Sequence, residues 1–133
     1  MWSDMFVHML DNGDNSFTIP EELQIVYWDY YSTEEKRYHD NFEKQLPISR
    51  RLGFAGGAWK WTGFVPHNAY SILAGRASMK SCKEFGIDSY TVTCWGDDGA
   101  EASCLSVLPT FFKDALVAYE SQMNDRSFEK LTG

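Results

Sequence analysis

The sequence predicts an α/β fold in which parallel strands alternate with helices. Runs rich in Val, Ile, Tyr and Trp recur along the chain, and the stretches between them carry helix caps and a helical spacing of apolar residues. Tryptophans near the ends of these runs follow one another at intervals of roughly 30 residues, the length of one strand with its helix. A whole (β/α)8 barrel needs about 250 residues. We therefore expect the 133 residues to form about four strands with following helices, a parallel-strand half of a (β/α)8 TIM barrel.

Four stretches have the composition of strands. Residues 1–6 resemble the end of a buried strand, and residues 23–31 are rich in Ile, Val, Tyr and Trp. Residues 52–59 form the third strand, although their glycines weaken strand propensity and are typical of a close backbone approach to a neighbour or ligand. Residues 89–95 form the fourth. Both ends of the chain look like interrupted elements, so we expect 1–133 to be a single domain, the C-terminal portion of a barrel.

The first helix is expected directly after the second strand. Ser32 and Glu35 have the spacing of a capping box, in which each side chain accepts a hydrogen bond from the other residue's backbone. The helix should run to about Gln45, because Pro47 cannot continue it.

Two more helices are expected further along the chain. Asn68 can cap a helix that runs to residue 85, and a later helix should cover about 101–120, with a kink at Pro109. Residues 125–133 look like the opening of another element.

Composition and charge exclude several classes of function. A formal net charge of −7 without a Lys/Arg cluster argues against binding to nucleic acid or to an anionic membrane. No apolar run approaches the roughly 20 residues of a membrane span, and no basic-then-apolar signal segment is present. The three cysteines are odd in number and lack metal-ligand spacing, which favours reduced thiols. We expect a soluble, cytoplasmic protein.

Aromatic residues with polar neighbours recur at the four predicted strand ends. Carboxyl ends of parallel strands lie at the same edge of a sheet, where α/β folds place their sites. Aromatic faces beside carboxylates suit a sugar, because the ring covers its apolar face and the carboxylate binds its hydroxyls. Packing in the core is the competing explanation for so many aromatics. The four clusters are Trp2-Ser3-Asp4, Tyr27-Trp28-Asp29, Trp59-Lys60-Trp61 and Trp95-Gly96-Asp97.

Alternation along a strand predicts which of these side chains lie together. Tyr27 and Asp29 point to one face of their strand and Trp28 to the other, and Trp95 and Asp97 repeat that spacing. The competing interpretation makes Tyr27 a core residue and Asp29 a helix cap. The acidic turn at 97–101 resembles a solvated helix N-terminus, so we expect no metal site and no cofactor.

Four segments at these positions resemble glycoside hydrolase family 20, the β-N-acetylhexosaminidases. The resemblance implies a (β/α)8 barrel that removes terminal N-acetylglucosamine or N-acetylgalactosamine with retention. The nucleophile in that family is the acetamido oxygen of the substrate, and an Asp-Glu pair after the fourth strand orients the acetamide and acts as general acid/base. The segments are Met1-Trp2-Ser3-Asp4-Met5, Val26-Tyr27-Trp28-Asp29-Tyr30-Tyr31, the stretch from Phe54 to Phe64, and Trp95-Gly96-Asp97-Asp98-Gly99-Ala100-Glu101.

The resemblance also implies roles for the polar residues of the site. Tyr27 would donate a hydrogen bond to the acetamido carbonyl oxygen and position it for attack. Asp29 and Asp97 would bind sugar hydroxyls. At the position of Asp97 many relatives carry Glu, whose carboxylate reaches further.

The tryptophans would supply the apolar surfaces. Trp95 would stack beneath the sugar ring, and Trp2 and Trp59 would enclose the acetyl methyl group. Trp61 competes with Trp59 for one family position.

The His-x-Gly-Gly-Asp-Glu stretch that carries the family's acid/base pair is absent from the sequence. We therefore expect the isolated chain to be catalytically inactive and to associate with an N-terminal barrel half or with copies of itself. Two other classes remain open. One is a non-catalytic carbohydrate-binding module, and the other is an interaction protein whose aromatics are only core.

Overall fold

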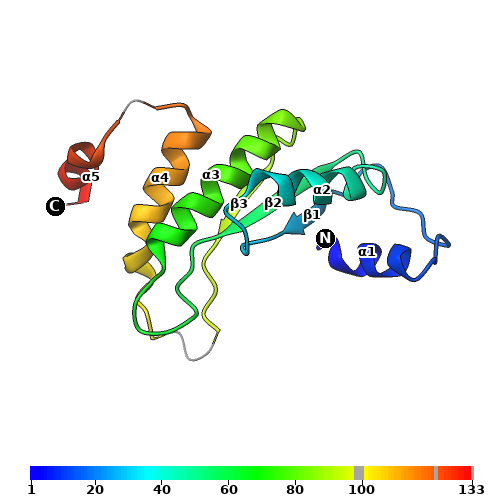
Figure 1. Ribbon diagram of the computed structural model, residues 1–133, viewed down its shortest axis with the longest axis horizontal. Coiled ribbons are helices and arrows are strands. Elements are labelled where there is room, and N and C mark those ends of the chain that lie inside the picture. The colour runs from blue at the N-terminus through cyan, green and yellow to red at the C-terminus, as the bar shows by residue number, and fades with distance from the viewer. Residues whose placement is uncertain (98–100, 122, 133) are drawn as a thin grey trace.

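The computed structural model describes residues 1–97, 101–121 and 123–132. These residues form a mixed α/β fold around a three-stranded parallel sheet (Figure 1). Its strands lie in the order β1 (Ile25–Trp28), β2 (Leu52–Gly57) and β3 (Tyr90–Thr93). Tyr27 is paired with Phe54, and Phe54 in turn with Tyr90, so equivalent positions of the three strands lie side by side. The predicted class and the parallel direction of the strands are confirmed.

The first predicted strand is reduced to a single bridge. Trp2 pairs with Val26 in the parallel direction, with hydrogen bonds from the Ser3 amide to the Val26 carbonyl (2.9 Å) and from the Val26 amide to the Met1 carbonyl (2.7 Å). The prediction of a strand up to residue 6 is wrong, because helix α1 (Asp4–Asp11) begins directly after Ser3. Its apolar residues recur with helical spacing, and Phe6 is buried against the core.

A helix follows each of β1, β2 and β3, as predicted, but the α-helix after β3 begins at Leu108 and not near residue 101. The helices after α1 are α2 (Glu35–Gln45), α3 (Asn68–Glu84), a short 3₁₀ turn η1 (Cys104–Val107), α4 (Leu108–Ala118) and α5 (Asp125–Thr132). Figure 1 shows α3 lying between α2 and α4, with contacts to both. The predicted capping box is not formed: Ser32 Oγ accepts from the amide of Glu34 (3.0 Å), and α2 starts without a side-chain cap.

Two residues predicted to shape helices have other roles. Pro109 lies in the first turn of α4, where a missing amide costs nothing, and therefore does not kink a helix interior. Asn68 is the first residue of α3 and does not cap it. Its side chain instead donates to the Ser106 carbonyl (2.8 Å) and accepts from Thr110 Oγ1 (2.8 Å). These two bonds join the start of α3 to the start of α4.

The core lies between one face of the sheet and helices α2 and α3. Phe54 at its centre is fully buried, with ring contacts to Tyr38 and Phe42 of α2 at centroid distances of 5.7 and 5.6 Å. Tyr27 and Tyr90 flank Phe54 on the neighbouring strands, at 5.5 and 5.3 Å. The face of the sheet that carries these three rings is therefore covered by helices.

Within the described ranges, none of the helices combines the length and the apolar composition that crossing a bilayer requires.

Candidate functional site

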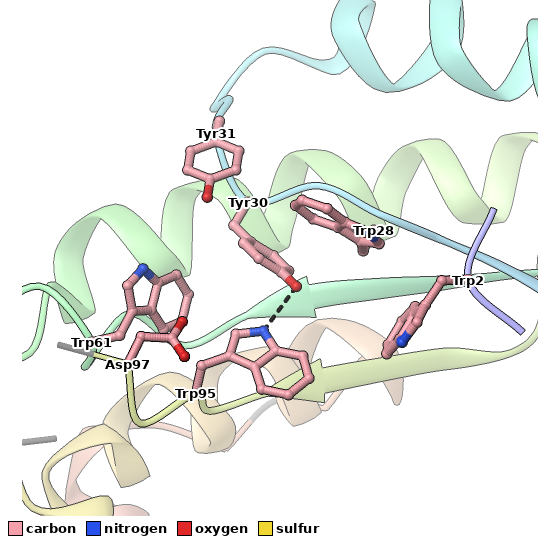
Figure 2. A pocket seen from close by; sticks show the side chains of 7 residues that line it. All are labelled: Trp2, Trp28, Tyr30, Tyr31, Trp61, Trp95 and Asp97. Atoms are coloured by element: carbon pink, nitrogen blue, oxygen red, sulfur yellow. Dashed lines mark hydrogen bonds between the residues drawn. The ribbon is translucent and has the colours of Figure 1, made fainter. Parts of the chain in front are cut away.

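A pocket of about 290 Å³ lies at the carboxyl ends of the strands, on the sheet face opposite the core (Figure 2). Its volume is close to the lower end of the range for small-molecule sites, roughly 300–1,000 Å³. Consecutive strand residues point to opposite faces of a sheet. Tyr27 of β1 points to the core, so Trp28, the next residue, points to the opposite face, where the pocket lies. The lining residues are Trp2, Trp28, Tyr30, Tyr31, Trp61, Trp95 and Asp97.

Tyr30 forms the centre of the pocket floor. It is 5% exposed, and its ring stacks on that of Trp28 at a centroid distance of 5.3 Å with an interplanar angle of 29°. Trp61, also buried, meets Tyr30 edge-on at 5.4 Å. These three rings come from the ends of β1 and β2 and form one continuous aromatic surface (Figure 2).

Trp95 forms the wall that β3 contributes. Its indole N–H donates to the hydroxyl oxygen of Tyr30 at 2.9 Å, so the hydroxyl's own proton is left for another acceptor. Trp2 meets Trp95 at 6.4 Å with an interplanar angle of 62°. Both indoles are partly open to solvent, with exposed fractions of 39% for Trp95 and 44% for Trp2. An apolar ring could therefore lie against them.

Asp97 places a carboxylate at the edge of this aromatic surface. Figure 2 shows it between the side chains of Trp61 and Trp95. The predicted pairing of Trp95 with Asp97 on one side of the strand end is confirmed. Asp98, also part of the predicted acidic turn, lies outside the described residues.

Glycine at position 57 creates the space that the floor needs. A Cβ there would lie 2.7 Å from Tyr30 Cδ1 and 2.9 Å from Trp61 Cη2, closer than side-chain carbons approach. The pocket face of β2 carries only small residues, Gly53, Ala55 and Gly57, and the rings of Tyr30 and Trp61 lie over Gly57. The close approach predicted from these glycines is confirmed: aromatic rings approach Gly57, and the side chains of Gln24 and Ser89 approach Gly53.

Tyr27 and Asp29 do not line this pocket. They share one side of their strand, as predicted, but that side faces the helices: the ring of Tyr27 meets Phe42 of α2 at 5.9 Å. The Tyr27 hydroxyl donates to Asp29 Oδ2 at 2.8 Å. The structure thus separates these two residues from Trp95 and Asp97, and the assignment of all of them to one pocket is corrected.

Asp29 is held by groups of the chain itself. Its carboxylate is 3% exposed and accepts from the Tyr27 hydroxyl, from the Tyr31 amide (2.9 Å) and from Arg37 Nε (2.6 Å). Burial, and to a smaller extent the negative charge of Asp29, raise the pKa of Tyr27 far above its usual range. Tyr27 therefore stays a neutral hydrogen-bond donor. The arrangement fixes the turn that carries Tyr30 and Tyr31 into the pocket.

Trp59 lies behind the pocket. Its ring stacks on Trp61 at 4.9 Å with an interplanar angle of 30°, and its indole N–H donates to the Tyr30 carbonyl at 3.1 Å. It is also in edge contact with Tyr31 at 5.3 Å. Of the residues expected to bind a sugar, the structure therefore brings together Trp2, Trp61, Trp95 and Asp97, and it places Trp59 as their support.

Sequence reasoning missed Trp28, Tyr30 and Tyr31. Both faces of β1 carry aromatic residues, so alternation alone does not tell which face is covered by helices. The small residues on the pocket face of β2 were the available clue, because a strand face without bulk leaves room for rings from its neighbours.

The comparisons with known proteins add no assignment. No family model matches this chain, and no curated protein sequence matches it.

Proposed function

We propose that this chain is part of a retaining exo-β-N-acetylhexosaminidase of glycoside hydrolase family 20, and that its pocket binds a terminal N-acetylhexosamine. The observation that carries the proposal is the aromatic pocket with the Asp97 carboxylate at its edge. Four separate chain segments contribute to it at the carboxyl ends of parallel strands, the place where sites of α/β folds form. The sequence segments that resemble the family are the same ones that supply these side chains.

The pocket suits both the apolar C–H face and the hydroxyl groups of a pyranose. Trp95 and Trp2 offer partly exposed indoles for the apolar C–H face of the sugar. Asp97 can accept hydrogen bonds from ring hydroxyls, and a bond to a charged acceptor is stronger than a neutral one. The floor of buried Trp61 and half-buried Trp28 suits a small apolar group such as an acetyl methyl.

Tyr30 takes the role that the resemblance gave to Tyr27. Its hydroxyl accepts from the Trp95 indole and keeps its own proton for an acceptor in the pocket, such as an acetamido carbonyl oxygen. The Tyr27 hydroxyl instead donates a hydrogen bond to Asp29, on the side of the strand that faces the helices. Tyr27 and Asp29 then act on the sugar indirectly, by fixing the turn before Tyr30.

The proposed enzyme needs an acid/base pair from elsewhere. The Asp-Glu stretch of the family is absent from the sequence, so this chain supplies binding and orientation only. Among the described residues, β3 is paired only with β2, which leaves one edge of β3 for a further strand. We propose that strands of an N-terminal barrel half, or of a second copy, occupy that edge. Light scattering tests this: a monodisperse monomer would count against it.

Titration with N-acetylglucosamine, followed by tryptophan fluorescence and by NMR, tests the proposal. We expect saturable binding by the chain, no binding of glucose, and about fivefold weaker binding by Trp95→Ala, since an aromatic contact contributes about 1 kcal/mol. Tyr119→Ala is the matched control, because Tyr119 is an 84% exposed aromatic at the end of α4, away from the pocket.

These outcomes separate a sugar-binding chain from an interaction protein, and the light-scattering test separates a barrel part from a self-sufficient carbohydrate-binding module. Saturable binding with no hydrolysis of a chromogenic β-N-acetylglucosaminide by the isolated chain supports the proposal. Hydrolysis that survives in the isolated chain contradicts the claim that the acid/base is missing. Equal binding by Trp95→Ala, or no binding at all, favours an interaction protein in which the aromatics are core.

A further inference from the structure

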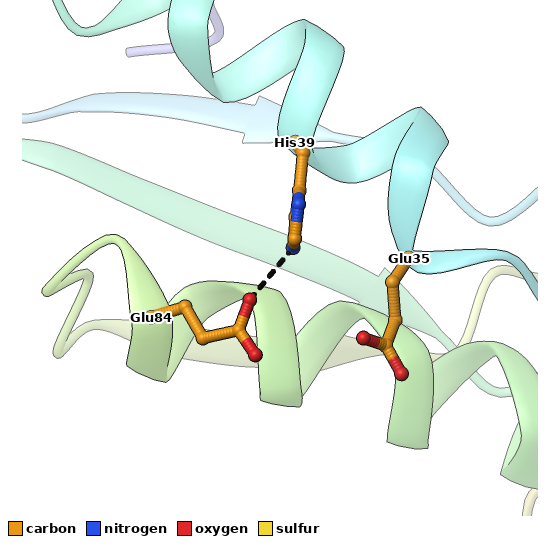
Figure 3. Close-up of side chains that lie close together, drawn as sticks. All are labelled: Glu35, His39 and Glu84. Atoms are coloured by element: carbon orange, nitrogen blue, oxygen red, sulfur yellow. Dashed lines mark ion pairs between the residues drawn. The ribbon is translucent and has the colours of Figure 1, made fainter.

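Three metal-ligating side chains meet at the outer surface of helices α2 and α3, away from the aromatic pocket (Figure 3). Glu35 and His39 are one helical turn apart on α2, and Glu84 is the last residue of α3. One ligand atom from each lies within 4.8 Å of the other two. The spacing i, i+4 puts the first two on the same side of their helix, which is also how helical metal motifs present a pair of ligands.

The imidazole of His39 points between the helices with its outer nitrogen unsatisfied. Nε2 lies 2.9 Å from Glu84 Oε2, but it is shielded from solvent and makes no well-aligned hydrogen bond with the described residues. The ring is held in this orientation by Phe85, at a centroid distance of 5.2 Å. A neutral imidazole nitrogen facing a carboxylate oxygen needs either a proton or a cation between them.

A cation already bridges the two carboxylates. Lys80 Nζ is 2.7 Å from Glu35 Oε2 and 4.0 Å from Glu84 Oε1. Its side chain is 59% exposed, so it can swing into solvent when another cation takes its position. The site therefore attracts positive charge, and Lys80 competes for it.

We propose that Glu35, His39 and Glu84 bind a divalent transition-metal ion, with Zn²⁺ the best fit. One imidazole nitrogen and two carboxylate oxygens are ligands that Zn²⁺ takes at about 2.0–2.2 Å, and water would complete the coordination. The three ligand atoms lie within 4.8 Å of one another, and the side chains of Glu35 and Glu84, 39% and 45% exposed, can rotate to bring their oxygens to a common ion on His39 Nε2. The bound ion would link α2 to α3 and so stabilise the layer of helices over the core.

Isothermal titration with Zn²⁺ on the whole chain tests the proposal, in a background in which Cys94 and Cys104 are serine. These two cysteines are the free thiols outside the core, and thiolates bind zinc strongly. We expect one Zn²⁺ per chain, with at least tenfold weaker binding by His39→Gln, which keeps the side chain's size. His8→Gln is the matched control, since His8 is an exposed histidine of α1. It should bind Zn²⁺ like the parent.

Lys80→Met gives the sharpest discrimination. It removes the competing ammonium and keeps the aliphatic stem, so Zn²⁺ should bind several-fold more tightly than to the parent. A purely structural ion-pair network would show no Zn²⁺ binding in either protein. Because His39→Gln could also alter the fold, the thermal midpoint is measured with and without Zn²⁺. We expect Zn²⁺ to raise the midpoint of the parent and of Lys80→Met, and to leave that of His39→Gln unchanged.

Two results would overturn the proposal. One is the absence of Zn²⁺ binding at micromolar concentrations in the cysteine-free background. The other is binding that is equal in the parent, His39→Gln and Glu84→Gln, which would place the ion elsewhere on this acidic chain.

Discussion

The indole N–H of Trp95 donates a hydrogen bond to the hydroxyl of Tyr30 at 2.9 Å, although the two residues are 65 positions apart in sequence. The bond crosses the open face of the sheet from the segment after β3 to the segment after β1. It orients the hydroxyl, so that the remaining proton of Tyr30 is directed to a different acceptor. This contact makes one pocket out of aromatic residues that the chain carries on separate strands.

Tyr30→Phe and Tyr27→Phe should therefore affect different properties: the first sugar binding, the second stability. Tyr30→Phe removes the hydroxyl in the pocket, and we expect about tenfold weaker N-acetylglucosamine binding, the cost of roughly one hydrogen bond. Tyr27→Phe leaves a buried carboxylate with one donor fewer and should lower stability while sugar affinity stays unchanged. NMR titration and urea unfolding measure the two properties. The reverse pattern would return the binding role to Tyr27.

Gly57→Ala should close the pocket floor. The new Cβ would lie 2.7 Å from Tyr30 and 2.9 Å from Trp61, so at least one ring has to move. We expect a loss of sugar binding and a change in tryptophan fluorescence. Gly13→Ala is a control for general glycine effects, because no atom lies within 4 Å of the corresponding Cβ, although its φ of +76° adds backbone strain. Unchanged sugar affinity of Gly57→Ala would mean that the floor does not contact the ligand.

Asp29→Asn should destabilise the protein by about 1–3 kcal/mol, since it weakens three bonds to a buried charged acceptor. The Arg37 side chain is 50% exposed, so water can solvate its guanidinium when the ion pair with Asp29 is lost, and this limits the loss of stability. Asp40→Asn is the matched control, for it removes an exposed carboxylate that pairs with Lys36 on the same helix. Its unfolding midpoint should hardly change. Similar midpoints for both variants would contradict the structural role of Asp29.

The parts of the fold that depend on local patterns were predictable. Composition located β1, β2 and β3 to within a few residues, and Pro47 marked the end of α2. Segments whose conformation depends on contacts with distant parts of the chain were not predictable. The segment after Ser3 forms a helix because Phe6 can reach the core from there, which no property of residues 1–6 taken alone indicates.

The sequence predicted that the site lies at the ends of the strands, but it did not predict which side chains of β1 line it. Alternation correctly grouped Tyr27 with Asp29 and Trp95 with Asp97. It could not tell which face of β1 the helices cover, because that depends on contacts such as Tyr27 with Phe42. One residue of offset exchanges the two faces of a strand. This is why Trp28 and Tyr30, and not Tyr27 and Asp29, lie in the pocket.

Gly75→Ala should destabilise α3, although glycine to alanine in a helix interior normally stabilises by about 0.5–1 kcal/mol. Here the added Cβ would collide with the buried carboxylate of Asp114 on α4, so that side chain or the two helices would have to shift. The same substitution in an Asp114→Ala background has no carboxylate to meet and should be neutral or stabilising. Urea unfolding of the double-mutant cycle measures this coupling. A destabilisation of equal size in both backgrounds would show that Asp114 is not the obstacle.

Asp114 should also make the stability of the protein depend on pH. It is 4% exposed, Oδ1 has no hydrogen-bond partner among the described residues, and burial raises its pKa from 3.8 to about 7 against the opposing effect of Arg76. Between about pH 4 and 7 the folded state thus holds a proton that the unfolded state has lost. Stability therefore falls as pH rises through this window.

Comparison with Asp114→Asn isolates this effect from other titrating groups. The variant has the shape of the protonated acid and lacks its titration, so the two proteins should be similar near pH 4. At pH 8 the variant should be more stable by about 2–4 kcal/mol, because a shift of one pKa unit corresponds to about 1.4 kcal/mol. Urea midpoints across this range measure the difference, and Asp88→Asn, at an exposed aspartate, is the control. A constant difference between parent and Asp114→Asn from pH 4 to 8 would contradict a protonated, buried Asp114.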